Sequence, residues 1–410
     1  MALTRRAFIA SGGAAAAVAA AAGVGYAAGQ EGDGSGVRPG DPHVVDFHGE
    51  HQAGIATPAQ DRLHFAAFDV EEGVDGRALR DLMQEWTVAA RTMAGGQSVG
   101  GGPAGSPLAP PDDTGEAMDL TPANLTVTFG FGASLFDRRD RFGVTKYRPA
   151  KLNELPDLPG DALAADRSGG DLCVQACAND PQVAFHAVRN LARMGRGLVT
   201  VRWSQLGFGR TSTTSKAQAT PRNLMGFKDG TANIKLEDAS DMAQHVWVHD
   251  DPSGWLDGGS YLVARRIRML IEVWDRASLR DQEDTIGRNK VLGAPLGGAN
   301  QADEFADFKP KALPDRSHVR LAHPDTNAGV KILRRGYSFT DGLESLGELD
   351  AGLFFLAYMH DPQSFITLQN RLGANDKLNE YIKHVGSGLW AIPPGVRPGG
   401  YVGDALLSRV

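Results

Sequence analysis

Cysteine is scarce in this chain, whose 410 residues include two, Cys173 and Cys177. Both lie in the apolar segment 172–178, which has the composition of a strand. Residues four positions apart in a strand are separated by about 13 Å, and a disulfide bond cannot span that distance. We therefore expect two small apolar side chains that pack in the core.

An excess of basic residues is also absent. Lys and Arg total 42 against 49 for Asp and Glu, which gives a formal net charge of −7. Because nucleic-acid binding depends on a basic surface, we expect no nucleic-acid partner. The hydrophobic fraction of 42% and the charged fraction of 22% are ordinary for a globular protein.

No long hydrophobic run is evident. The most apolar stretch near the start, 14–22, is rich in Ala and is followed by Gly23 and Gly25. This stretch is too short and too weakly apolar to indicate a membrane span. A mature chain of about 370 residues is long enough for two domains or one duplicated domain.

The paired Arg5 and Arg6 stand in the segment T-R-R-A-F-I at 4–9, just before the Ala-rich stretch. This arrangement is typical of a twin-arginine export signal, and the small residues near 26–28 offer a cleavage site. The alternative is a cytosolic protein with a chance arginine pair. We expect a signal over 1–29 and a flexible linker over 30–45. The twin-arginine translocase would then export a folded, cofactor-loaded protein to the cell exterior, cell envelope or periplasm.

The two halves of the chain resemble each other. Segment 172–182 matches segment 353–363 at Leu, Ala, Asp, Pro and Gln, and each copy is an apolar run followed by an Asp-Pro turn. Further upstream, L-R-D at 79–81 matches L-R-D at 279–281. Two matches in the same order indicate an internal duplication.

Each half is predicted to contain strands and amphipathic helices in the same order. The expected strands are Leu63–Val70, Leu125–Phe131, Leu172–Ala178, Tyr261–Val273, Ile332–Phe339 and Leu353–Met359. The helices after the Asp-Pro turns carry Phe185, Val188 and Leu191 in one half and Phe365, Leu368 and Leu372 in the other. The pattern predicts an α+β fold of two ferredoxin-like domains, over 46–212 and 213–410, with antiparallel sheets and flanking helices.

Three segments carry residues suited to chemistry. They are G-F-K-D-G-T-A-N at 226–233, S-H-V-R-L-A-H-P at 317–324 and I-L-R-R-G-Y-S-F at 332–339. Each has an ordinary explanation when taken alone. An Asp-Gly pair is a turn signal, and a lone His or an Arg pair is usually a packed or solvated side chain.

Together and in this order, the segments resemble the dye-decolourising haem peroxidases, specifically an exported branch that includes deferrochelatase-type enzymes. The family signature is G-x-x-D-G followed by a His and an Arg, which here fall at 226–230, His318 and Arg334. The segments 286–288, 293–296 and 399–403 also fit. The resemblance implies two ferredoxin-like domains of the dimeric α+β barrel type. It also implies non-covalently bound haem b. Separately, the chain has no C-x-x-C-H motif, which excludes haem attached through thioethers.

The resemblance also implies roles for individual residues. His318 becomes the axial ligand of the haem iron, with His323 as its rival in the same segment. On the opposite haem face, Asp229 accepts the proton of hydrogen peroxide and Arg334 supplies a fixed positive charge. A ligating His usually donates its second N–H to another group, and the sequence does not reveal that group.

Other residues are assigned with less support from the motifs. Gly230, Phe355 and Arg334 are expected to border the cofactor, and Arg288 to contact a haem propionate. Arg335 is expected to face a propionate or solvent. The following aromatic residues are expected in the core rather than in a radical relay: Trp203, Trp247, Trp390, Tyr337 and Tyr381.

The resulting prediction is an oxidoreductase that reduces hydrogen peroxide and oxidises dye-like or phenolic aromatic donors by one-electron steps. The alternative is a haem-handling protein that releases iron from haem. A chlorite dismutase-like enzyme is disfavoured because that family lacks the distal Asp. Cargo packaging in a protein shell is disfavoured by the export signal, and a homo-oligomer is left open.

Overall fold

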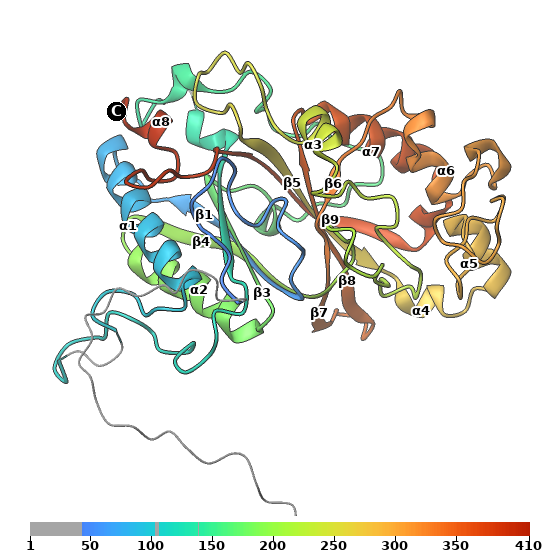
Figure 1. The fold of residues 1–410 in the computed structure, drawn as a ribbon, viewed down its shortest axis with the longest axis horizontal. Helices are drawn as coiled ribbons and strands as arrows, with labels where there is room; N and C mark the ends of the chain where they lie inside the picture. The colour runs from blue at the N-terminus through green and yellow to red at the C-terminus, as the bar shows by residue number, and fades with distance from the viewer. Residues whose placement is uncertain (1–42, 103–105, 138) are drawn as a thin grey trace, which may run out of the picture. The chain divides into compact units, whose positions relative to one another are not determined.

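A computed structural model of the chain describes residues 43–102, 106–137 and 139–410 (Figure 1). The export signal expected over 1–29 lies outside these residues, as does the expected linker up to residue 42. Among the residues that are described, no helix has both the length and the apolar character needed to cross a membrane.

Nine strands of the described chain form one sheet in the order β5-β9-β2-β3-β1-β4-β7-β8-β6, and β5 also pairs with β8. All pairings between these strands are antiparallel. The strands are β1 Arg62–Val70, β2 Thr126–Gly132, β3 Leu172–Ala178, β4 Val199–Arg210, β5 Ser260–Met269, β6 Leu333–Arg334, β7 Tyr337–Leu343, β8 Leu349–Met359 and β9 Ile382–Ile392.

Most α-helices lie in two groups, with α1, α2 and α8 near one end of the sheet and α4 to α7 toward the other, and α3 is drawn between them (Figure 1). They are α1 Gly76–Ala94, α2 Pro181–Met194, α3 Ala239–His245, α4 Ile271–Trp274, α5 Leu279–Ile286, α6 His318–Ala322, α7 Gln363–Asn375 and α8 Asp404–Leu407. The Asp180 side chain caps α2 by accepting hydrogen bonds from Gln182 N–H and Val183 N–H, and Pro181 opens the helix.

The duplication expected from the sequence is visible in the order of elements. The main elements of the first half run in the order β1-α1-β2-β3-α2-β4. Those of the second half run in the matching order β5-α5-β7-β8-α7-β9, with short additional elements between them. The α+β ferredoxin-like prediction is therefore confirmed. The boundaries at 46–212 and 213–410 stay predictions, since one continuous sheet runs through both halves.

One expected strand is wrong in its second part. The strand predicted over Tyr261–Val273 ends at Met269, and Ile271–Trp274 forms the short helix α4. Pairing of β5 with β8 ends at Arg268 and pairing with β9 ends at Met269, so the chain beyond has no ladder partner. The apolar residues that suggested a longer strand instead bury Trp274 in a hydrophobic cluster.

Two smaller expectations are also corrected. The strand predicted over Ile332–Phe339 is interrupted at Arg335 and Gly336, although β6 and β7 keep the same register against β8. Phe185 is 39% exposed rather than buried, and its ring stacks on His64. By contrast, Cys173 and Cys177 are free, buried residues of β3, as expected.

Candidate active site

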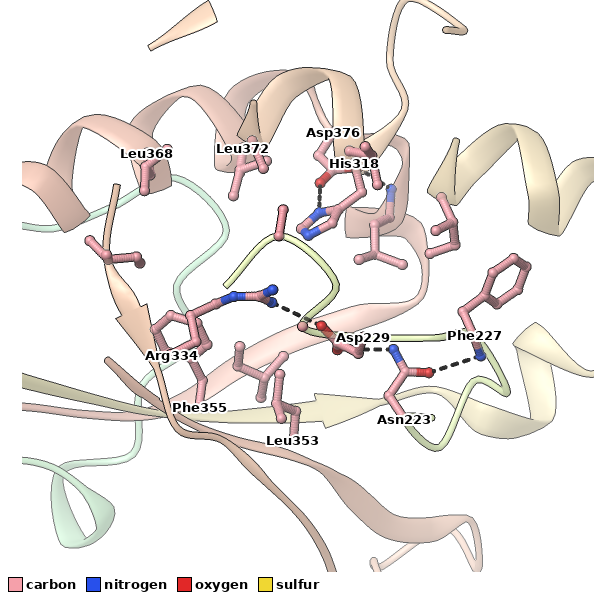
Figure 2. A pocket seen from close by; sticks show the side chains of 18 of the residues that line it. Asn223, Phe227, Asp229, His318, Arg334, Leu353, Phe355, Leu368, Leu372 and Asp376 are labelled. Atoms are coloured by element: carbon pink, nitrogen blue, oxygen red, sulfur yellow. Dashed lines mark hydrogen bonds and ion pairs between the residues drawn. The ribbon is translucent and has the colours of Figure 1, made fainter. Parts of the chain in front are cut away.

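The three sequence motifs converge on one cavity of about 470 Å³ in the second half of the chain. Its walls include Asp229 from the loop after β4, His318 from the start of α6 and Arg334 from β6 (Figure 2). A sheet face contributes Leu353 and Phe355 from β8. Most of the remaining wall is apolar, and α7 contributes Leu368 and Leu372.

His318 is held from behind by a buried carboxylate. Its Nδ1 lies 2.6 Å from Oδ2 of Asp376, a residue that the sequence did not single out. The second oxygen of Asp376 accepts the Leu378 N–H at 2.8 Å, so the carboxylate is fixed from both sides. Burial lowers the pKa of His318, but the charge and hydrogen bond of Asp376 outweigh it and raise the pKa above its ordinary value.

This hydrogen bond selects one form of the imidazole. When Nδ1 donates to Asp376, the neutral ring keeps its lone pair on Nε2. Figure 2 shows the His318 ring between Asp376 and the side of the cavity where Arg334 and Asp229 lie. The arrangement is the one that a metal-ligating histidine requires.

His323 also borders the cavity, but its hydrogen bond selects the opposite form of the ring. Its Nδ1 accepts the Asp325 N–H at 3.1 Å and caps a short turn. In the neutral ring, the proton is then on Nε2, which has no lone pair to offer. The ring also packs edge-on against Phe308. The geometry therefore favours His318 over His323 as a ligand.

Asp229 and Arg334 form an ion pair within the cavity. Nη1 of Arg334 donates to Oδ1 of Asp229 at 2.8 Å, and Nδ2 of Asn223 donates to Oδ2 of Asp229 at 3.2 Å (Figure 2). Both carboxylate oxygens are thus held by donors, and the remaining donors of the guanidinium can act elsewhere. Burial and, after it, the charge of Arg334 lower the pKa of Lys235 to about 8.

Gly230 and Phe355 line the cavity, as expected. Gly230 has a φ of +85°, and a Cβ there would lie 2.6 Å from Cα of Ser212, so the loop needs glycine at this point. Arg288 is buried in the wall, where it donates to the carbonyls of Gly293 and Glu304 at 2.7 and 2.8 Å. Burial lowers the pKa of Arg288.

The expectation for Arg335 is wrong. Its side chain is fully buried, away from the cavity, and donates to the carbonyls of Ile55 and Thr57 and to Oε1 of Gln60. Successive residues of a strand point to opposite faces, so when Arg334 faces the cavity, Arg335 faces the core. Of the two adjacent arginines, Arg334 lines the cavity and Arg335 lies in the core.

Sequence reasoning missed a polar group in the cavity wall. Arg265, Gln369 and His384 all line the cavity, and Arg265 is ion-paired with Asp161 from the first half of the chain. Burial and the charge of Arg265 lower the pKa of His384 to about 3, so this ring is neutral. Arg265, Gln369 and His384 stand outside the three motifs, and their partners are distant in sequence, so no local pattern marks them.

The aromatic residues set aside as core are mostly buried. Tyr337 and Trp390 are fully buried, Tyr381 and Trp247 are nearly so, and Trp203 is half-buried.

The residues of this cavity fit a haem. A predominantly apolar cavity suits the macrocycle, and the free Nε2 of His318 suits its iron. The duplicated α+β fold and this cavity define a haem-binding oxidoreductase.

Comparison with known proteins gives the family. Residues 52–209 match the family model described as Dyp-type peroxidase, N-terminal, and residues 220–397 match Dyp-type peroxidase, C-terminal. Over 375 residues, the chain is 39% identical to a deferrochelatase of Escherichia coli, covering 88% of this chain and 86% of the relative.

Solved structures agree with this result. Ferric DtpA from Streptomyces lividans superimposes with a TM-score of 0.81 at 41% identity, covering 89% of this chain and 97% of that chain. A DyP-type peroxidase from Cellulomonas bogoriensis gives 0.77 at 38% identity, covering 89% and 98%. The chain belongs to the Dyp-type peroxidase family. It is a peroxidase, its cofactor is haem, and its substrates are hydrogen peroxide and a reductant.

Proposed function

We propose that His318 is the axial ligand of the haem iron and that Asp229 and Arg334 act on hydrogen peroxide at the opposite haem face. One observation carries this proposal. The Asp229–Arg334 ion pair, at 2.8 Å, lines the same cavity as His318, whose Nε2 is free. When bound, haem would supply the iron centre at which peroxide is reduced and from which oxidising equivalents pass to aromatic donors.

Asp229 is placed to move a proton. Its carboxylate accepts hydrogen bonds from Arg334 and Asn223, which orient the oxygens toward the cavity. A carboxylate held in this way takes the proton from the bound peroxide oxygen and returns it to the departing oxygen as water forms. The side chain is partly exposed, so it exchanges protons with solvent between turnovers.

Arg334 is placed to stabilise negative charge. A guanidinium is charged at all working pH values and carries five N–H donors. One donor of Arg334 is used on Asp229, which leaves others for the oxygen that becomes negative as the O–O bond breaks. A fixed donor in a largely apolar cavity is worth more than the same donor in water.

The test compares the peroxide reaction of three variants of the haem-loaded protein. We expect Arg334→Leu to slow the peroxide-induced change of the Soret band by about 10²- to 10³-fold. Asp229→Asn should slow it less, because a chain of water molecules can replace the carboxylate in part. The control is Arg280→Leu, which removes an arginine that is 93% exposed on α5. Near-normal rates in Arg334→Leu would contradict the proposed role.

A second candidate function is release of iron from haem. It is favoured by the 39% identity to proteins named deferrochelatase. Both functions use the same cavity and the same His318, so geometry alone does not separate them. Incubation of the holoprotein without peroxide, followed by fluorescence detection of free protoporphyrin, would distinguish iron release from peroxidase turnover measured in parallel.

We further propose that the chain is exported by the twin-arginine route and acts in the periplasm, the cell envelope or the medium. The support is the segment T-R-R-A-F-I at 4–9 and the Ala-rich run after it. A protein that must carry haem benefits from this route, because it can fold around the cofactor before export.

A further inference from the structure

Arg334 lies on a very short strand at the edge of the sheet. β6 comprises Leu333 and Arg334 and pairs with β8 on one side. The N–H of Arg335 donates to the Leu356 carbonyl on that side at 2.8 Å. Backbone groups of successive strand residues point to opposite sides, so the N–H and C=O of Arg334 point away from β8. These groups need partners from elsewhere.

Asn233 bonds to both groups, and Oγ of Ser212 is a second donor to the Arg334 carbonyl, at 2.9 Å. Oδ1 of Asn233 accepts the Arg334 N–H at 2.8 Å, and its Nδ2 donates to the Arg334 carbonyl at 2.8 Å. Nδ2 also donates to the Thr213 carbonyl at 2.9 Å. Because carbonyls accept and never donate, these bonds fix which end of the carboxamide is nitrogen. The side chain thus pairs with Arg334 as a neighbouring strand would, and it is 8% exposed.

Asn233 belongs to the same loop as Asp229. Its own N–H donates to the Gly230 carbonyl at 3.1 Å, which closes a turn directly after Asp229. Asn233 therefore ties the backbone of Arg334 to the loop that carries its ion-pair partner. The Asp229–Arg334 ion pair joins two flexible side-chain ends, whereas the Asn233 bonds fix the main chain from which the guanidinium extends.

We propose that Asn233 is a positioning residue for Arg334. Its carboxamide sets the distance and direction of the Arg334 guanidinium relative to Asp229 and to the ligand on the iron. The inference rests on the role proposed above for Arg334. A donor displaced by about 1 Å can lose about 10²-fold in rate, so a residue that holds the backbone of Arg334 should affect every ligand that Arg334 stabilises.

Fluoride binding to the ferric holoprotein, titrated through the Soret band, tests this without turnover. Fluoride on the iron accepts hydrogen bonds, so Arg334→Leu should weaken its binding. We expect Asn233→Ala to weaken fluoride binding about tenfold or more, in line with the cost of misplacing a donor. In the double variant Asn233→Ala/Arg334→Leu, binding should be no weaker than in Arg334→Leu alone, because the removed contact acts only through Arg334.

The matched control is Asn190→Ala. Asn190 is a fully buried residue of α2 whose carboxamide also makes three hydrogen bonds, to His186 and Thr114. The Asn190→Ala substitution should lower the midpoint of unfolding but leave the affinity for fluoride unchanged. An Asn233→Ala variant that binds fluoride like the wild type would overturn the proposal, as would additive losses in the double variant. If Arg334→Leu itself binds fluoride normally, the role of Arg334 and the inference both fail.

Asn233→Asp keeps the proposal testable if the alanine variant does not fold. The carboxylate still accepts the Arg334 N–H but places a bare oxygen against the Thr213 and Arg334 carbonyls. Protonation of the introduced carboxylate restores one donor. The fluoride affinity of Asn233→Asp, relative to that of the wild type, should therefore rise as the pH falls from about 7 to about 5. In an Arg334→Leu background this ratio should stay flat, whereas a rise there would indicate a simple charge effect and overturn the proposal.

Discussion

The imidazole of His318 and the carboxylate of Asp376 meet at 2.6 Å although 58 residues separate them in the sequence. The Asp376 carboxylate is almost completely buried, and it connects the helix that presents His318 to the turn that follows α7. The pairing decides which nitrogen of His318 faces the cavity, and so whether the ring can act as a ligand.

Replacing Asp376 by Asn should weaken haem binding by about 10- to 100-fold, the usual cost of losing the group behind a metal-ligating histidine. The amide no longer holds the proton on Nδ1 with a negative charge, so the ring loses its orientation. Transfer of haem to an excess of apomyoglobin measures the change. Asp284→Asn, which alters a partly exposed carboxylate of α5, should retain haem like the wild type.

The choice between the two histidines can be checked directly. His318→Ala should lose haem or bind it far more weakly, because the axial bond is gone. His323→Ala should keep the Soret band, since the Nδ1 of His323 is used on the Asp325 N–H. Absorption spectra and haem content of the two purified variants are the measurement. A normal spectrum for His318→Ala together with haem loss in His323→Ala would reverse the assignment.

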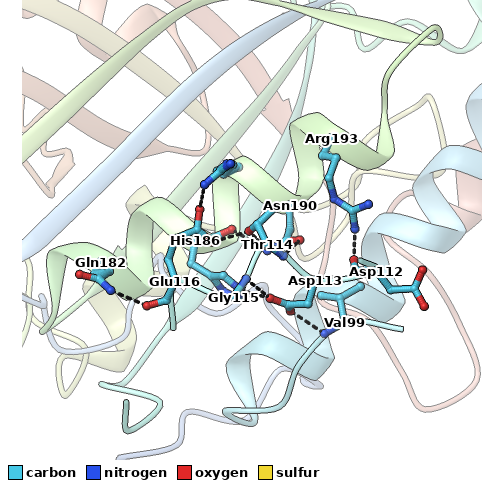
Figure 3. A network of polar contacts seen from close by, with 11 residues as sticks. Val99, Asp112, Asp113, Thr114, Gly115, Glu116, Gln182, His186, Asn190 and Arg193 are labelled. Carbon is cyan, nitrogen blue, oxygen red and sulfur yellow. Dashed lines mark hydrogen bonds and ion pairs between the residues drawn. The ribbon is translucent and has the colours of Figure 1, made fainter. Parts of the chain in front are cut away.

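A buried carboxylate also organises the first half of the chain. Asp113 accepts hydrogen bonds from His186 at 2.8 Å, from the Val99 N–H at 2.8 Å and from the Gly115 N–H at 2.7 Å (Figure 3). These contacts attach Val99 and residues 113–115 to α2. Burial raises the pKa of Asp113, but the hydrogen bonds from His186, Val99 and Gly115 outweigh it and lower the pKa below its ordinary value.

A lowered native pKa means that the ionised Asp113 stabilises the fold above the pKa of the unfolded chain, near 4. This stability is lost as the pH falls through the lower native value. Asp113→Asn should therefore cost about 1–3 kcal/mol at neutral pH, and the difference from wild type should shrink in acid. Urea unfolding at pH 7 and in acid tests this, with the exposed Asp119→Asn as control. A difference that grows in acid would contradict the assignment.

The export prediction is tested in cells. Replacing Arg5 and Arg6 by Lys should leave the precursor in the cytoplasm, folded and loaded with haem. Cell fractionation followed by immunoblotting and a Soret measurement of each fraction shows where the protein is. Undiminished export of the Lys-Lys form would count against a twin-arginine signal.

Much of the fold could be predicted because it depends on local patterns. Asp-Pro turns and apolar periodicity repeat in both halves, and they correctly marked the strand–helix units around β3 and β8. The error at Ile271–Trp274 arose because an apolar run is compatible with strand or helix. The length of β5 was decided by where its pairing with β8 and β9 stops, and those strands are distant in sequence from residue 270.

The sequence by itself determined the chemistry available to this protein: a histidine, an aspartate and an arginine in motifs of one peroxidase family. Only the tertiary structure decided which neighbour of each motif residue matters. It placed Asp376 behind His318, turned Arg335 into the core and set Asn233 against Arg334. The physical reason is that hydrogen-bond partners of buried polar groups are chosen by proximity in the folded chain, where residues far apart in sequence share one desolvated space.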